Sequence, residues 1–246
     1  MTFPMPSNSL CARLWVGTIS MLMLSQWLHA IPIRVLAWDN EIAARKLAIA
    51  DAKGAVPIEA MHPSKRTQPY QVTVGEKPIT IQALDKTDKN GKPAASEVII
   101  PEGTKEPLLL LLPDVKSATG LRLLVLEDDA SHFPWGGIRF INACGKPLVF
   151  AYENKVLTLP ASWTPVVVNP GGHNRNMETR IFSSDLPKHP IYSSVWEQNQ
   201  NVRTLIIIVP GEDPRLGPVA MKMIAENRRV KEMEAAASHS RTGQGR

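Results

Sequence analysis

Apolar and polar residues alternate along most of the chain after residue 69. The first clear instances are residues 70–74 and 79–83, which the turn Gly75-Glu76-Lys77-Pro78 separates. Successive side chains of a β-strand point to opposite faces, so this period of two predicts strands. Further strands are predicted at residues 96–100, 108–112, 121–126, 137–142, 147–152, 156–159, 165–168, 177–182, 191–196 and 202–209.

The spacing of these strands predicts an all-β fold. They recur at intervals of about ten residues, and the gaps are too short for the crossover helices that join neighbouring parallel strands. We therefore expect an antiparallel β-sandwich, Ig-like or jelly-roll-like, over residues 70–224. The unbroken apolar run at residues 205–209 indicates a strand that is buried on both faces.

The segments that flank this domain lack the alternation. Residues 38–69 are expected to form a short helix, from apolar residues at helical spacing, and then a proline-containing linker. Residues 218–224 fit either a last strand or the start of a helix. Residues 225–246 are predicted to be helical at first and then disordered, because the end of the chain is small, polar and basic.

Residues 1–37 have the pattern of an export signal. Arg13 precedes twenty residues, 14–33, without a charged side chain, as in a secretory signal peptide. Small residues allow cleavage after Ala30 or Ala37, although neither site is ideal. If the segment is not cleaved, it is long enough to anchor the chain in the inner membrane, and a buried helix is a third reading. We expect a periplasmic or secreted protein.

The two cysteines do not indicate a disulfide or a lipid anchor. Cys11 precedes the apolar stretch, whereas the cysteine of a lipoprotein would follow it. Removal of the signal peptide leaves Cys144 as the only cysteine, so an internal disulfide bond cannot form. We expect Cys144 to act as a small buried apolar residue and not as a reactive thiol.

Charge is concentrated at the two ends of the chain. The sequence has 28 Lys and Arg against 23 Asp and Glu, a net charge of +5, but residues 38–225 hold 21 basic and 20 acidic residues. Arg139 and Arg203 stand alone within predicted strands, and the pair Lys65-Arg66 is expected to be solvated. Nucleic-acid binding needs concentrated positive charge, so nucleic acid is excluded as a partner.

The centre of the chain resembles a group of uncharacterised exported bacterial β-rich proteins. Residues 133–142, FPWGGIRFIN, fit the pattern F-P-x-G-x-x-R-F-x-N, which follows a strand with the acidic end Glu127-Asp128-Asp129. Residues 192–196 and 203–210 are similar to the closing part of those proteins. The resemblance covers about residues 70–210. It implies an exported β-rich domain and supplies no catalytic residues.

No motif predicts a metal, a cofactor or an active site. A copper site would need His and Met shortly after Cys144, and the loop histidines have no metal-ligand spacing. No G-x-S-x-G motif is present, and adjacency of Ser131 and His132 does not itself form a nucleophile–base pair. The carboxylates of residues 127–129 are expected to protect a strand edge with their charge. The loop histidines considered above as metal ligands are His132, His173 and His189.

Aromatic residues near strand ends are the best candidates for ligand binding. Sugar-binding sandwiches use exposed aromatic rings, although buried aromatic residues are commoner. An exposed row on one sheet face would favour a glycan ligand, and aromatic residues inside the sandwich would favour a structural role. The candidates are Trp135, Trp163, Tyr192 and Trp196.

These patterns together predict a non-enzymatic exported protein. The expected function is an envelope-associated binding or structural module, with a glycan or an envelope protein as partner. One alternative is a carbohydrate-binding or carbohydrate-active module. Another is a periplasmic accessory of an assembly or transport system, held in the membrane by an uncleaved amino-terminal segment. The sequence predicts no other contact with the membrane.

Overall fold

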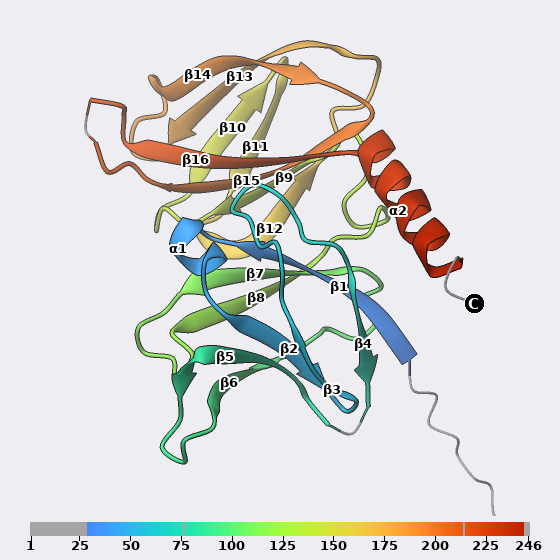
Figure 1. Cartoon of the computed structure of the whole chain (residues 1–246). Helices are drawn as coiled ribbons and strands as arrows, with labels where there is room; N and C mark the ends of the chain where they lie inside the picture. Colours follow the sequence, from blue (N-terminus) through green and yellow to red (C-terminus); the bar gives the residue numbers. More distant parts are fainter. Residues whose placement is uncertain (1–28, 76, 214, 244–246) are drawn as a thin grey trace, which may run out of the picture.

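The protein is described by a computed structural model that covers residues 29–75, 77–213 and 215–243 (Figure 1). The described residues are mostly β-strand, which confirms the predicted all-β class. The strands are β1 (His29–Ala37), β2 (Leu47–Asp51), β3 (Gly54–Pro57), β4 (Tyr70–Val74), β5 (Ile79–Thr87), β6 (Pro93–Val98), β7 (Pro107–Pro113), β8 (Leu121–Glu127), β9 (Ile138–Asn142), β10 (Leu148–Tyr152), β11 (Lys155–Leu159), β12 (Ser162–Val168), β13 (Arg175–Ser183), β14 (Pro190–Gln198), β15 (Val202–Pro210) and β16 (Val219–Asn227). The helices are α1 (Asn40–Ala43) and α2 (Arg228–Gly243).

The strands form two units with the same topology. The first unit, β1–β8, has one sheet in the order β4-β1-β7-β8 and a second in the order β3-β2-β5-β6. The second unit, β9–β16, has sheets in the orders β12-β9-β15-β16 and β11-β10-β13-β14. Adding eight to each strand number of the first unit gives the second. The chain therefore contains a structural repeat, which no internal similarity of sequence predicted.

The pairing registers place individual residues of the two units in equivalent positions. In the first unit, β1 and β7 are parallel, and Arg34 lies opposite Leu108. In the second, β9 and β15 are parallel, and Arg139 lies opposite Leu205. These parallel pairs correct the expectation of antiparallel pairing throughout. The short gaps do exclude a parallel crossover between consecutive strands. They do not exclude parallel pairing of β1 with β7 or of β9 with β15, because five further strands lie between the members of each pair and supply the connection.

Within the described residues, three apolar cores lie between four sheets. One fills the first unit, and another fills the second unit. The third lies between the units, where the sheet of β1, β7 and β8 packs against the sheet of β9, β15 and β16. The two units are therefore stacked and share a core (Figure 1).

Strand β15 has buried residues on both faces, as its apolar run predicts. Leu205 and Ile207 belong to the core between the units, whereas Ile206 and Ile208 belong to the core of the second unit. Strand β7 repeats this arrangement in the first unit with leucines at positions 108–112. Since a strand alternates its side chains, only an uninterrupted apolar run can serve two cores at once.

Strand β1 changes the expected division of the amino-terminal part. Residues 1–28 lie outside the described residues, so the signal peptide and the anchor stay predictions. The following nine residues, also assigned to that segment, form β1, in which Ile33, Val35 and Ala37 are fully buried. A mature chain that began at Trp38 would lack this strand, which lies between β4 and β7.

Residues 38–69 also contain more β-structure than expected. Helix α1 is a single turn, and the Asp39 carboxylate accepts a hydrogen bond from the Ile42 amide at its start. Strands β2 and β3 follow where a helix and a linker were expected. Residues 47–50 are all buried, so their apolar spacing reflects a central strand and not a helical face.

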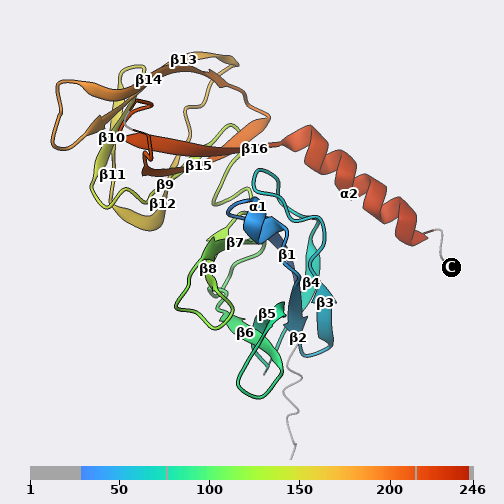
Figure 2. The ribbon, with the colours of Figure 1, turned by 60° about the vertical axis from the view of Figure 1, so that its left-hand side comes forward.

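The carboxyl-terminal boundary also differs, since β16 continues to Asn227 and α2 starts at Arg228. Figure 2 shows α2 extending from the end of β16. Its Lys231 ammonium lies 2.6 Å from the Glu106 carboxylate, which places α2 against the first unit. No helix within the described ranges is long and apolar enough to cross a membrane.

Candidate functional site

A cluster of buried charges lies between the two units. The Asp128 carboxylate, directly after β8, accepts hydrogen bonds from Arg34 at 3.0 Å, Arg66 at 2.8 Å and Arg203 at 3.2 Å. Glu226 of β16 accepts further bonds from Arg34 and from Arg203, the latter at 2.7 Å. Because these residues come from both units, the cluster holds the units together.

The cluster corrects two expectations from the sequence. Asp128 was expected to protect a strand edge and Arg66 to be solvated, but their side chains are only 1% and 3% exposed. The arginines that surround Asp128 are far from it in sequence, and only folding brings them together. A usable signal is the position of Arg203 within a strand, two residues before the apolar run at residues 205–209, where a charged side chain needs a buried partner.

Burial and neighbouring charges shift pKa values in the cluster. Burial of Glu226 raises its pKa, but Arg66 and Arg34 outweigh that effect and lower the pKa to about 2. Burial lowers the pKa of Arg139 to about 10; Asp128 opposes this shift, and Arg203 and Arg66 add to it. Both groups are therefore ionised at neutral pH.

The segment with the F-P-x-G-x-x-R-F-x-N pattern joins the two units. The Phe133 ring is fully buried, with the guanidinium groups of Arg139 and Arg203 at 4.3 and 5.0 Å from its centre. A Cβ atom on Gly137 would lie 2.7 Å from the Pro134 carbonyl oxygen, so the tight turn requires glycine. These residues shape the connection and pack it against the charge cluster.

Ser131, His132 and Asp129 lie together without the geometry of a hydrolytic triad. The Asp129 carboxylate accepts a hydrogen bond from the Ser131 hydroxyl and lies 2.8 Å from His132 Nδ1. Ser131 Oγ lies 3.3 Å from the same nitrogen, whereas a triad places nucleophile and carboxylate at opposite ring nitrogens. Burial raises the pKa of Asp129, but hydrogen bonds from Ser131 and His132 outweigh it and lower that pKa.

The described residues also lack the features of a metal site or a reactive thiol. No group of three or more His, Cys, Asp or Glu side chains within them could hold a metal ion. Cys144 is a free thiol that packs against the core of the second unit, and burial raises its pKa. A raised pKa reduces the thiolate fraction and hence the nucleophilicity.

Two of the four candidate aromatic residues lie near the junction of the units. The Trp135 ring centre is 4.6 Å from the Arg203 guanidinium, and the Trp163 ring centre is 4.2 Å from that of Arg122. Trp163 also contacts Trp38 edge to face, with ring centres 6.4 Å apart. Both candidates are half-buried and occupied by contacts within the protein.

The other two candidates lie together on β14. The indole Nε1 of Trp196 donates a hydrogen bond to the Tyr192 hydroxyl at 3.1 Å. Trp196 stacks inward on Phe150 and Phe140, with ring centres 5.4 and 6.3 Å away. The structure thus brings Tyr192 and Trp196 together, but the four candidates do not form one exposed row.

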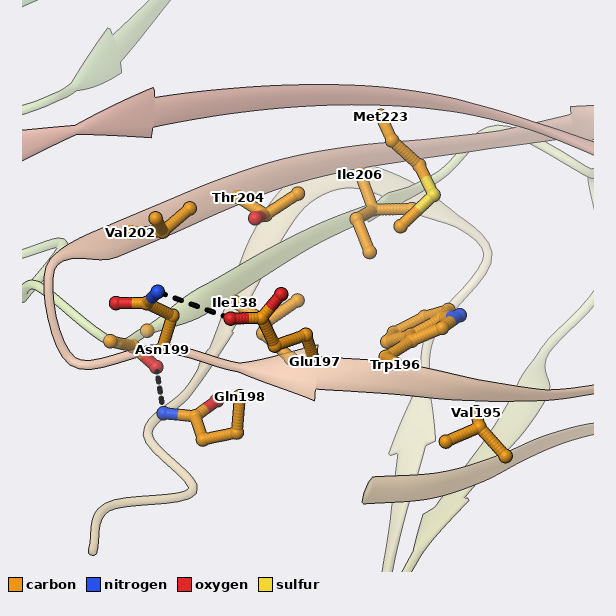
Figure 3. Close-up of a pocket in the computed structure, with 12 residues that line it drawn as sticks. Ile138, Val195, Trp196, Glu197, Gln198, Asn199, Val202, Thr204, Ile206 and Met223 are labelled. Atoms are coloured by element: carbon orange, nitrogen blue, oxygen red, sulfur yellow. Dashed lines mark hydrogen bonds between the residues drawn. The ribbon is translucent and has the colours of Figure 1, made fainter. Parts of the chain in front are cut away.

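A pocket of about 290 Å³ opens beside Trp196 (Figure 3). It lies between β14 and β16, which end the two sheets of the second unit. Trp196 of β14 faces Ile206 and Met223 across the gap, and Gln198 lies at one end (Figure 3). We call this gap, bounded by Val195, Trp196, Ile206 and Met223, the β14–β16 mouth.

The equivalent gap of the first unit is closed. Strands β6 and β8 are the counterparts of β14 and β16, and they contact each other directly. The Ser96 hydroxyl of β6 is 2.7 Å from the hydroxyl of Thr119, which is fully buried in the loop before β8. No hydrogen bond joins β14 to β16 in the described part of the chain. The mouth is therefore a difference between two otherwise matching units.

No family model matches the chain, and no curated protein matches it. Its function must therefore be inferred from the geometry of the two units. The described residues include two concave features that could hold a ligand, the β14–β16 mouth and a larger pocket between the units, lined by Arg139 and Trp163.

Proposed function

We propose that this chain is an exported, non-enzymatic binding module of the bacterial envelope. In this proposal the β14–β16 mouth binds an extended peptide segment of a partner protein. The open mouth carries the proposal, because the first unit closes the same position with its own side chains. The apolar amino-terminal segment, with its signal-peptide pattern, supports export.

The two edge strands favour strand addition. Both β14 and β16 are nine residues long, and each pairs with a neighbour on one side only. Proteins usually protect such edges with short strands, charges or bulges. Two apolar side chains beside the mouth, Val195 and Met223, are nevertheless 59% and 45% exposed. An extended peptide could pair with a free edge and place alternate side chains in the pocket.

The aromatic residues favour a peptide over a glycan. Sugar binding uses the open face of an aromatic ring, but Trp196 stacks inward on Phe150 and Phe140. Trp135 and Trp163 face arginine side chains. A peptide side chain could instead fill the gap between Trp196 and Met223.

The charged residues support a non-enzymatic role. The two carboxylates of the charge cluster, Asp128 and Glu226, form ion pairs with arginines and do not line the β14–β16 mouth. These bonds and the shared core stiffen the stack of two units. A stiff scaffold holds an edge strand in place for a partner and reduces the entropic cost of binding.

Co-purification from the envelope of the native host tests this function. Val195→Arg and Met223→Arg should each abolish recovery of the partner, while the matched control Val156→Arg should retain it. Val156 is an exposed valine on β11, at the opposite edge of the sheet that contains β14. All variants should keep the parent melting temperature, since these side chains are exposed.

Equal recovery with all three variants would contradict the proposal. Saturable binding on a glycan array that Trp196→Ala removes would favour the carbohydrate alternative instead.

A further inference from the structure

A second pocket, of about 500 Å³, lies between the units where β8 and β12 face each other. Its walls are largely apolar and include Leu124, Val125, Trp163, Pro165 and Val167. This volume is within the range of small-molecule sites. The pocket is separate from the β14–β16 mouth and shares no lining residue with it.

Arg139 in the pocket wall has unsatisfied hydrogen-bonding capacity. Its Nε and Nη1 atoms have no hydrogen-bond partner, while Nη2 donates to the backbone carbonyls of Glu127 and His132. The Asp128 carboxylate lies 3.7 Å from Nη1, which is within ion-pair distance but too far for a hydrogen bond. The Arg139 side chain is only 3% exposed, and buried N–H groups without partners are costly.

The repeat shows what Arg139 lacks. Arg34 occupies the equivalent position in the first unit, since it lies opposite Leu108 as Arg139 lies opposite Leu205. Arg34 donates hydrogen bonds to two carboxylates, Asp128 and Glu226. Arg139 donates a hydrogen bond to neither carboxylate. Four arginines surround these two carboxylates, so the positive charge of the cluster exceeds its negative charge and favours an added anion.

The flank beside Arg34 is also covered by the protein itself. Arg34 lines a smaller pocket together with Lys231 and Glu234 of α2. Helix α2 follows β16, whereas the corresponding strand β8 is followed by the connection to β9. In the described part of the chain, no helix residue lines the pocket beside Arg139, and no carboxylate accepts a hydrogen bond from its guanidinium.

We propose that the pocket between β8 and β12 binds a small amphipathic carboxylate, with its head group at Arg139 and its apolar body along Leu124, Pro165 and Val167. Among the described residues that line the wall, Glu127 is the acidic one, and its carboxylate lies 3.3 Å from His132 Nε2. Arg139 Nε and Nη1 are shielded from solvent, so the proposal requires a side chain of the wall to move before the head group can contact them.

Titration calorimetry on the full chain tests the proposal with three probes: octanoate, 1-octanol and acetate. Octanoate should bind with a dissociation constant at least about tenfold below that of either other probe, because it alone has both the charge and the apolar body. Equal binding of octanol would show that no charge is recognised. Equal binding of acetate would show an adventitious ion only. Either result would overturn the proposal.

Two substitutions locate the site without removing Arg139, which supports the fold. Val167→Glu places a negative charge in the pocket wall at a residue that is 38% exposed, and it should weaken octanoate binding at least about tenfold. Val156→Glu makes the same change on β11, away from the pocket, and should leave the affinity unchanged. If both variants bind octanoate equally well, the ligand lies elsewhere and the assignment is wrong.

Discussion

The guanidinium of Arg203 forms hydrogen bonds with three separate parts of the chain. It donates hydrogen bonds to the backbone carbonyls of Asp128 at 2.6 Å and Phe133 at 3.0 Å, and to the Glu226 carboxylate. Its side chain is fully buried. Removing one member of such a network leaves the others desolvated and unpaired, which costs more than the intact network contributes.

Arg203→Met should therefore lower the free energy of unfolding by about 3–5 kcal/mol. Arg180→Met is the control, since Arg180 is 58% exposed on β13, and its effect should stay within about 0.5 kcal/mol. Urea denaturation of both variants measures the difference. Equal midpoints would show that the charge cluster does not stabilise the fold.

Glu226 gives the stability a dependence on pH. Its pKa falls from an ordinary value of 4.5 to about 2 on folding, so the folded state binds fewer protons than the unfolded state between these values. The contribution is complete above about pH 4.5 and is lost as the pH falls towards 2.

Melting temperatures measured across this range should therefore decline more steeply for the parent protein than for Glu226→Gln. Glu178→Gln, at an exposed residue of β13, serves as the control and should follow the parent. Parallel curves for the parent and Glu226→Gln would contradict the assigned pKa.

Among the elements, sequence patterns predicted strands β4 to β15, whereas residues 218–224, most of which belong to β16, were left open between a strand and the start of a helix. Each of these strands has its own alternation or apolar run, and β4 matches its expected bounds. Strand β1 was missed because its apolar residues continue an export-signal pattern, and β2 because Leu47 and Ile49 also fit helical spacing. Local periodicity also cannot show which strands pair. It therefore could not predict the parallel pairing of β1 with β7, which gives that sheet both parallel and antiparallel neighbours.

The candidate sites were predicted less completely than the strands. Trp196 was named as a candidate from the sequence because aromatic residues can be recognised singly, and its part in binding stays a prediction. The surroundings of Arg139 could not be predicted, because they depend on Asp128, Arg34 and the repeat, which meet only in the folded chain.

The buried position of β1 gives a direct prediction about truncation. A chain that starts at His29 should fold, whereas one that starts at Trp38 should not, since it loses a strand between β4 and β7 and its buried side chains. Circular dichroism with thermal melting distinguishes the two. A cooperative transition for the shorter chain would show that β1 is dispensable.

At the scale of the whole molecule, the shared core makes the two units one cooperative structure. Leu110 of β7 and Ile207 of β15 are fully buried in this core and not in the core of either unit. The charge cluster spans the same interface. Neither unit can separate without exposing apolar surface and unpaired charges.

Calorimetric unfolding should therefore show one transition. Leu110→Ala should shift all of it to lower temperature, with a loss of about 2–5 kcal/mol. If unfolding shows two transitions and Leu110→Ala shifts only one of them, the units are independent.

The central claim is that a partner peptide binds at the β14–β16 mouth. The most direct measurement is photocrosslinking in the native host, with p-benzoylphenylalanine in place of Val195 or, as control, Val156. We expect an ultraviolet-dependent adduct at Val195 that maps to an extended segment of one protein and disappears with Met223→Arg. Equal adducts at both positions, or none at Val195, would contradict it.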